Sequence, residues 1–126
     1  TERDLGCEHL PIWTGSDQTG REEGSAGIAS PRAGSGRTGG IRNHHPTLKP
    51  IALLRWMVKL LAVPDGKILD TFAGSGSTLM ACILEGVDYV GIELEDSYIP
   101  IIEARTQWAK EQRFRDTRQL SLFGGL

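Results

Sequence analysis

The fold of this chain is set by one stretch, KILDTFAGSGSTLMACILEGVDYVGIEL, residues 67–94. It opens with the apolar run KILDTF (67–72), which follows a Pro-Asp-Gly turn and predicts a strand. The next letters, STLMACILEG (77–86), predict a helix that begins at the hydroxyl residues and ends at the glycine. A second strand is predicted over DYVGIEL (88–94). Two strands joined through a helix by short links form a βαβ unit, so we expect them to be parallel.

Helices are predicted on both sides of this unit. Upstream, apolar residues recur at helical spacing from Ile51 to Leu61, which predicts an amphipathic helix over 50–62. Downstream, a third helix is expected to begin with Asp96 as its N-cap and to end near residue 112. The fold class is therefore α/β.

The composition is that of one small globular domain. The chain has 126 residues, of which 39% are hydrophobic and 24% charged, and its formal net charge is −2. This charge gives no global signal for nucleic acid, so any contact with DNA must come from a local patch. No apolar run is long enough to span a membrane and no signal peptide is recognised, which favours a cytoplasmic protein. The two cysteines, Cys7 and Cys82, are accordingly expected to be reduced thiols.

The chain divides into three predicted regions, 1–42, 43–112 and 113–126. Within the first, residues 14–42 are rich in glycine and poor in large apolar side chains, so we expect a partly disordered segment. Two interpretations of it stay open, a plain linker or a loop that contacts DNA phosphates. The arginines available for such contacts are Arg21, Arg32, Arg37 and Arg42. Because the first residue is Thr1 rather than Met, we expect a fragment, a processed product or a trimmed chain.

Gly74 and Gly76 lie between the first strand and its helix, where open α/β folds bind their ligands. A P-loop would need a lysine in this turn, and the turn has none, which argues against nucleoside triphosphate hydrolysis. A dinucleotide site would need a third glycine where Leu79 stands, so that match is only partial. Asp70 would also repel a pyrophosphate at short range.

S-adenosylmethionine suits this turn better, because it has no phosphate and carries an ammonium and a sulfonium. Asp70 at the strand tip can face its positive methionine end, and Phe72 can pack against the adenosine or methionine portion. Glu93, at the end of the second strand, can accept both ribose hydroxyls, as an acid does in dinucleotide folds. The alternative interpretations are a solvated strand-end charge for Glu93 and a plain tight turn for the glycines.

Three blocks now carry a family resemblance: NHHPTLKP (43–50), ILDTFAGSGST (68–78) and DYVGIELEDSYIPIIEAR (88–105). In this order they resemble the carboxyl half of the beta-class DNA amino-methyltransferases, bacterial and phage enzymes that methylate N4 of cytosine or N6 of adenine. The resemblance covers residues 43 to about 110 and departs at Thr71, where the family usually has proline. It implies a partial Rossmann-like methyltransferase fold, with 1–42 as the end of a target-recognition region.

The resemblance also implies S-adenosylmethionine as the cofactor, DNA as the substrate, and a set of cofactor-binding residues. These residues are His45, Thr47, Lys49, Pro50, Asp70, Phe72, Gly74, Ser75, Gly76, Ser77 and Glu93. In this assignment the HPTLKP block (45–50) closes over the methionine end, where Lys49 pairs with the cofactor carboxylate and Thr47 hydrogen-bonds it. Without the family, the same block predicts only a turn and a helix cap.

A metal site is not expected in this chain. His44 and His45 are adjacent, and two adjacent side chains rarely converge on one ion. The candidate further ligands, Cys7 and His9, are separated from them by the glycine-rich stretch.

The family's catalytic tetrapeptide, (Asp/Ser/Asn)-Pro-Pro-aromatic, is not found in this sequence. Its six prolines include no adjacent pair. We therefore assign no catalytic residue and expect the chain to bind S-adenosylmethionine alone but not to methylate. Two strands leave a sheet incomplete, so we also expect a homodimer or a complementary chain that carries the missing half. The alternative function is a non-catalytic binding module, either a subunit of a split enzyme or a truncated remnant.

The tail contains a second pattern, QLSLF (119–123), which resembles the peptide by which bacterial proteins dock onto the DNA sliding clamp. In such a contact Leu120, Leu122 and Phe123 fill an apolar pocket, and Gln119 makes polar anchor contacts. Its alternating letters are equally compatible with a third strand.

Overall fold

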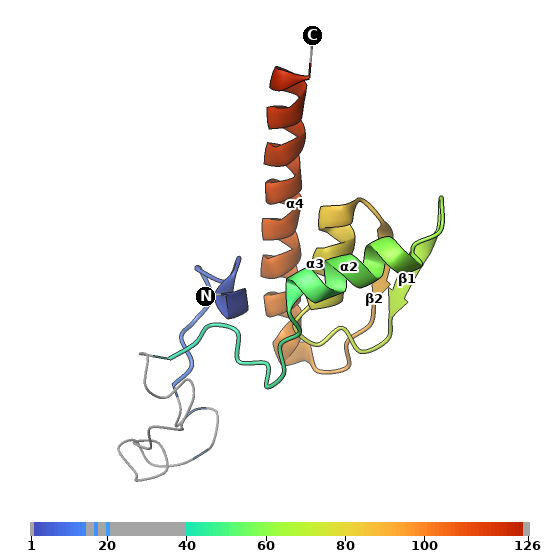
Figure 1. Cartoon of the computed structure of the whole chain (residues 1–126). Helices are drawn as coiled ribbons and strands as arrows, with labels where there is room; N and C mark the ends of the chain where they lie inside the picture. The colour runs from blue at the N-terminus through green and yellow to red at the C-terminus, as the bar shows by residue number, and fades with distance from the viewer. Residues whose placement is uncertain (1, 15–16, 18–19, 21–39, 125–126) are drawn as a thin grey trace.

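The computed structural model describes residues 2–14, 17, 20 and 40–124. The strand–helix–strand unit has one α-helix before it and one after it, in the predicted order (Figure 1). The described residues also form two short 3₁₀ helices. The elements are η1 (Glu2–Asp4), α2 (Ile51–Leu61), β1 (Lys67–Asp70), α3 (Ser77–Glu85), β2 (Asp88–Gly91), η3 (Asp96–Tyr98) and α4 (Ile99–Phe123). The predicted α/β class is therefore confirmed.

The two strands form a parallel pair, as the βαβ pattern predicts. Their register places Lys67 opposite Asp88 and Asp70 opposite Gly91. Both strands are shorter than predicted. β1 ends at Asp70 because its carboxylate Oδ1 accepts a hydrogen bond from the Phe72 backbone N–H (3.1 Å), which folds the chain into a turn.

α3 begins and ends at glycines in the left-handed conformation. Gly86 closes it at φ +76°, as predicted. The predicted hydroxyl N-cap is wrong: Gly76, at φ +73°, occupies that position, and no side chain caps the helix. The Gly76 N–H instead donates to the Ala73 carbonyl (2.8 Å), closing a tight turn that aims the chain into the helix.

α3 is the central helix, with α2 packed on one side and α4 on the other (Figure 1). Its buried side chains Met80 and Ile83 pack with Ile51 of α2 and Ala109 of α4 in one core cluster. Because the sheet has only two strands, burial of apolar surface between these helices is the main contribution to the stability of the fold.

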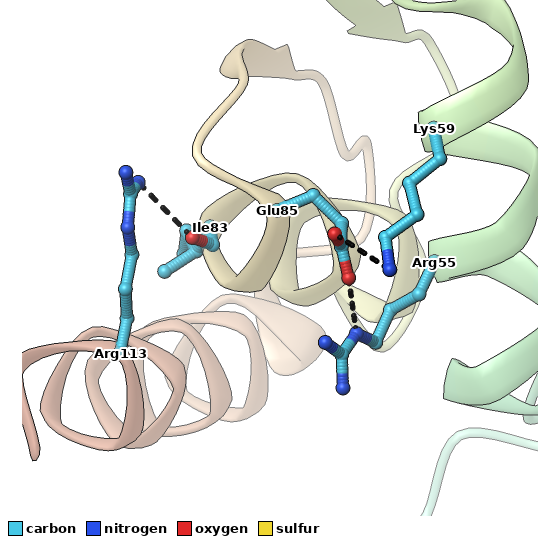
Figure 2. A network of polar contacts seen from close by, with 5 residues as sticks. All are labelled: Arg55, Lys59, Ile83, Glu85 and Arg113. Carbon is cyan, nitrogen blue, oxygen red and sulfur yellow. Dashed lines mark hydrogen bonds and ion pairs between the residues drawn. The ribbon is translucent and has the colours of Figure 1, made fainter. Parts of the chain in front are cut away.

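Polar contacts tie the same three helices together at the far end of α3 (Figure 2). Glu85 forms ion pairs with Arg55 and Lys59 of α2, the latter at 3.2 Å. On the other side, Arg113 of α4 donates to the Ile83 carbonyl (3.2 Å). These contacts lie at the end of α3 opposite the glycine-rich turn.

One face of the sheet is left uncovered in the described part of the chain. Ile68 and Tyr89 point into the core beside α3, whereas Leu69 and Val90 of the same strands are exposed. Further exposed apolar side chains lie on α2, at Leu53, Trp56 and Leu60, and on the loop after β2, at Ile92 and Leu94. Exposed apolar side chains on a sheet face are typical of a surface that another protein segment covers.

α4 differs most from its prediction. The helix begins at Ile99, with Pro100 in its first turn, and continues to Phe123 instead of ending near 112. The strand alternative for QLSLF is therefore wrong, because these residues are helical. Asp96 is not its N-cap. It opens the separate 3₁₀ turn η3, whose cap is Glu95.

The first residues of the chain pack against α4. Gly6 lies so close that a Cβ there would be 2.7 Å from the Ala104 carbonyl oxygen. The Arg42 guanidinium donates to the Leu10 carbonyl through one nitrogen and is half-buried, and its contact with phosphate stays a prediction. The backbone of Trp13 bridges to that of Ile41 in antiparallel fashion. The predicted phosphate contacts of Arg21, Arg32 and Arg37 lie outside the described residues.

Both cysteines are buried free thiols, and burial raises the pKa of Cys7 to about 11. Among the described residues, no three His, Cys, Asp or Glu side chains are grouped to hold a metal ion. His44 stacks on Trp13 with ring centroids 4.3 Å apart, and both His44 and His45 lie against the ring of Tyr98. In the described ranges, no helix combines the length and apolar character that crossing a bilayer requires.

Candidate functional site

A cleft of about 710 Å³ opens at the carboxyl ends of the two strands. Its walls are the glycine-rich turn after β1, the tip of β2, the HPTLKP block and the first half of α2. It is lined by His45, Thr47, Lys49, Leu53, Leu54, Met57, Asp70, Phe72, Ala73, Gly74, Ser75, Ser77, Thr78 and Glu93. Of the residues predicted to bind a cofactor, all but Pro50 and Gly76 line it. The volume is in the range of small-molecule sites.

Glu93 fastens the glycine-rich turn to the tip of β2. Its carboxylate Oε2 accepts a hydrogen bond from the Gly74 N–H (2.7 Å), and Oε1 accepts one from the Glu95 N–H (2.9 Å). These bonds, the one from Glu95 foremost, lower the pKa of Glu93, so the carboxylate is ionised at neutral pH. Each oxygen keeps lone-pair capacity for a ligand donor in the cleft.

Asp70 and Phe72 form the other strand tip. One Asp70 oxygen accepts the Phe72 N–H, and the side chain lines the cleft. The Phe72 ring lines the cleft too, yet 88% of the residue is exposed to solvent. An exposed ring beside a pocket gains buried area when a flat apolar ligand packs on it.

His45 lies directly over Gly74. A Cβ added to Gly74 would be 2.7 Å from His45 Nε2, and Gly74 has φ +54°, so only glycine suits the position. His45 Nδ1 lies 2.7 Å from the Thr47 carbonyl oxygen and 3.3 Å from the Thr47 backbone nitrogen, so two contacts with Thr47 hold the ring at the wall of the cleft.

Ser75 and Ser77 line the cleft, and both are almost fully buried. Their hydroxyl oxygens lie 3.3 Å apart. Ser77 Oγ also accepts a hydrogen bond from Arg105 of α4 (3.2 Å). Gly76 stays out of the cleft wall and contributes the backbone turn.

The apolar wall of the cleft was not predicted from the sequence. It is formed by Leu53, Leu54 and Met57 of α2, a helix that was predicted only as part of the core. The available signal was a second apolar stripe, since Leu53 and Met57 are four residues apart on one helix face.

Comparison with known proteins identifies the family of the chain. Residues 4–104 match the family model N6_N4_Mtase, described as DNA methylase. The chain belongs to this family. Its residues 4–104 include every block of the cleft, from the HPTLKP segment to the tip of β2.

Several curated relatives are similar over part of their length. The putative methylase YubD of Escherichia coli (strain K12) is 46% identical over 55 residues, 44% of this chain and 24% of that protein. Type II methyltransferase M.ScaI of Streptomyces caespitosus is 33% identical over 82 residues, 65% of this chain and 27% of that protein. DNA adenine methyltransferase YhdJ of E. coli (strain K12) is 41% identical over 56 residues, 44% of this chain and 19% of that protein.

The chain therefore spans about a quarter or less of the length of these relatives. No solved structure matches it.

Acidification is expected to loosen the site before the helical core. The pKa of Glu93 is lowered from its ordinary value of 4.5, chiefly by the Glu95 N–H, so its bonds stabilise the fold above that pH. This stabilisation is lost as pH falls below 4.5 and the carboxylate is protonated. Thermal melting between about pH 6 and 3 should show a smaller pH dependence in Glu93→Gln than in the wild type. An identical dependence in both would contradict the assignment.

Proposed function

We propose that the cleft binds S-adenosylmethionine and that the chain is the cofactor-binding portion of a site-specific DNA methyltransferase. The target would be an exocyclic amino group, N6 of adenine or N4 of cytosine. One observation carries the proposal: carboxylates stand at both strand tips of a glycine-rich turn that has no phosphate-binding lysine. A cationic nucleoside without phosphate is the ligand complementary to that arrangement.

The residues present fit this cofactor. The ionised Glu93 would accept the ribose hydroxyls while it holds Gly74, and Phe72 would pack on the flat portion of the ligand. Asp70 would face the sulfonium or ammonium, and Lys49 with Thr47 would bind the carboxylate. When bound, the cofactor supplies an activated methyl group, and these side chains bind and orient it.

The same proposal explains the uncovered sheet face. The two strands would be part of a larger Rossmann-like sheet, completed by a complementary chain or a second copy that covers Leu69 and Val90. The acceptors that polarise the target amine would come from a Pro-Pro tetrapeptide outside this chain, where no two prolines are adjacent. We accordingly propose that this chain by itself binds the cofactor but does not methylate DNA. We also propose that it acts in the cytoplasm of a bacterial or phage-infected cell.

Calorimetric titration tests the ligand. S-adenosylmethionine is expected to bind at least about tenfold more tightly than NAD, because Asp70 disfavours a pyrophosphate and Leu79 stands where a dinucleotide turn needs its third glycine. Glu93→Ala should weaken S-adenosylmethionine about tenfold, since it loses the ribose acceptor and the brace on Gly74. Glu103→Ala is the matched control, because it removes an exposed acid of α4 that does not line the cleft. Tighter binding of NAD would overturn the proposal.

Methyl transfer tests the enzyme portion. Labelled methyl groups should reach DNA when this chain is mixed with a chain that carries the tetrapeptide, and not with either chain alone. Light scattering on the same samples should show a complex. Methyl transfer by this chain alone would contradict the proposal. So would a chain that stays monomeric in dilute solution and shows no methyl transfer when the second chain is added.

We also propose that the tail docks onto a bacterial sliding clamp. Leu120 and Leu122 are 73% and 77% exposed near the end of α4, so an apolar pocket on a partner can reach them once this end unwinds. A clamp pull-down should lose the chain in Leu120→Ala and Leu122→Ala and retain it in Thr117→Ala. Equal capture of all variants would refute the docking.

A further inference from the structure

Arg105 is a fully buried cation in the middle of the described structure. Its residue exposure is 0%, and burial lowers the pKa of its guanidinium. It donates to the carbonyls of Glu2 (3.1 Å) and Arg3 (2.8 Å) and to Ser77 Oγ (3.2 Å), while its Nε has no hydrogen-bond partner. Burial of a charged group costs free energy unless hydrogen bonds replace its hydration, and the three contacts of Arg105 provide such bonds.

On one side Arg105 holds residues 2–4, here called the N-terminal strap. The strap in turn holds both ends of the HPTLKP block. Arg3 donates to the carbonyls of Asn43 (3.1 Å) and His45 (2.9 Å), and the Glu2 carboxylate accepts the N–H of Ile51 (2.6 Å), the first residue of α2. The cleft wall formed by this block thus depends on the strap.

On the other side Arg105 faces the cleft through two hydroxyls. A guanidinium can only donate hydrogen bonds, so Ser77 Oγ is the acceptor in their contact. The Ser77 proton must then point elsewhere, and the Ser75 oxygen lies 3.3 Å away. Either hydroxyl can be the donor in this pair, and in both cases one O–H proton is left over. Since both serines line the cleft, that O–H group can point to a ligand there.

We propose that Arg105 is a positioning residue for the carboxylate end of the ligand, acting through Ser77 and Ser75 and anchored by the N-terminal strap. The proposal rests on the proposed function, because it assumes that the cleft takes S-adenosylmethionine. Of the groups on that molecule, the carboxylate is the strongest acceptor for an O–H donor, and Lys49 lines the same cleft as the two serines. The proposal predicts that loss of this contact weakens binding of the carboxylate end and leaves binding of the rest of the ligand unchanged.

The test compares S-adenosylmethionine with decarboxylated S-adenosylmethionine, which keeps the sulfonium, the ammonium and the nucleoside. Calorimetry on the full chain measures both dissociation constants for the wild type, Ser77→Ala and Arg105→Lys. Ser77→Ala is expected to weaken S-adenosylmethionine about tenfold and to change the decarboxylated ligand less than about twofold. Arg105→Lys should act in the same direction, because an ammonium does not reproduce the fork of donors.

Arg113→Lys is the matched control, because Arg113 is also an α4 arginine that donates to a backbone carbonyl, away from the cleft. It should change neither ligand. Proportional losses for both ligands in Ser77→Ala would show a merely structural role and overturn the proposal, as would no change for either. If circular dichroism shows Arg105→Lys unfolded, Ser77→Ala decides. A wild type that binds neither ligand refutes the proposed function itself and is thereby distinguished.

Discussion

Gly74→Ala is expected to lower the affinity for S-adenosylmethionine by at least about 100-fold. The added Cβ would lie 2.7 Å from His45 Nε2, so either the imidazole leaves the cleft wall or the turn moves. Movement of the turn also breaks the bond from the Gly74 N–H to Glu93. In addition, alanine at φ +54° costs about 1–2 kcal/mol of backbone strain. Calorimetry gives the affinity, and urea unfolding gives the stability.

Gly86→Ala separates the two effects. Gly86 has a similar left-handed conformation, φ +76°, at the opposite end of the same helix. A Cβ there would meet the flexible end of Arg113 rather than a cleft residue. We expect a comparable loss of stability with ligand affinity unchanged within about twofold. Retention of wild-type affinity by Gly74→Ala would show that His45 does not close the cleft as the structure places it.

The βαβ unit was predictable because its signals are local. A short apolar run, a helical run closed by Gly86 and a second apolar run lie within residues 67–94, and each has a direct structural cause. The end of α4 was not predictable in this way. Residues 113–118 are mostly polar, and the apolar residues beyond residue 112 do not recur at helical spacing, so periodicity indicates nothing there. Good helix formers such as Arg, Gln and Leu extend the helix.

Most of the candidate site was predictable for a similar reason. Asp70, Gly74 and Glu93 stand at the carboxyl ends of adjacent parallel strands, and the fold alone brings such ends together. His45 and Lys49 were predicted as site residues only from the family resemblance, since nothing in their spacing indicates that they lie beside β1. Contacts such as that of Arg105 with Glu2 span most of the chain, and no local pattern encodes them.

Arg105→Met is expected to lower the free energy of unfolding by at least about 3 kcal/mol. Methionine fills similar space but donates no hydrogen bond, so the Glu2 carbonyl and Ser77 Oγ each lose the Arg105 donor, and the Arg3 carbonyl keeps only the bond from the Asn43 side chain. Each such unsatisfied group costs about 1–3 kcal/mol. For a domain with one small core, this is a large share of total stability. Urea unfolding followed by circular dichroism measures it.

Arg113→Met is the control for this prediction. Arg113 likewise donates from α4 to one carbonyl, that of Ile83, but its side chain is largely at the surface. Its loss should change stability by about 0.5 kcal/mol or less. The contrast matters because burial, not the residue type, is what makes Arg105 costly to lose. If both variants unfolded at the same urea concentration, the N-terminal strap would not be held by Arg105, and the HPTLKP block would need another anchor.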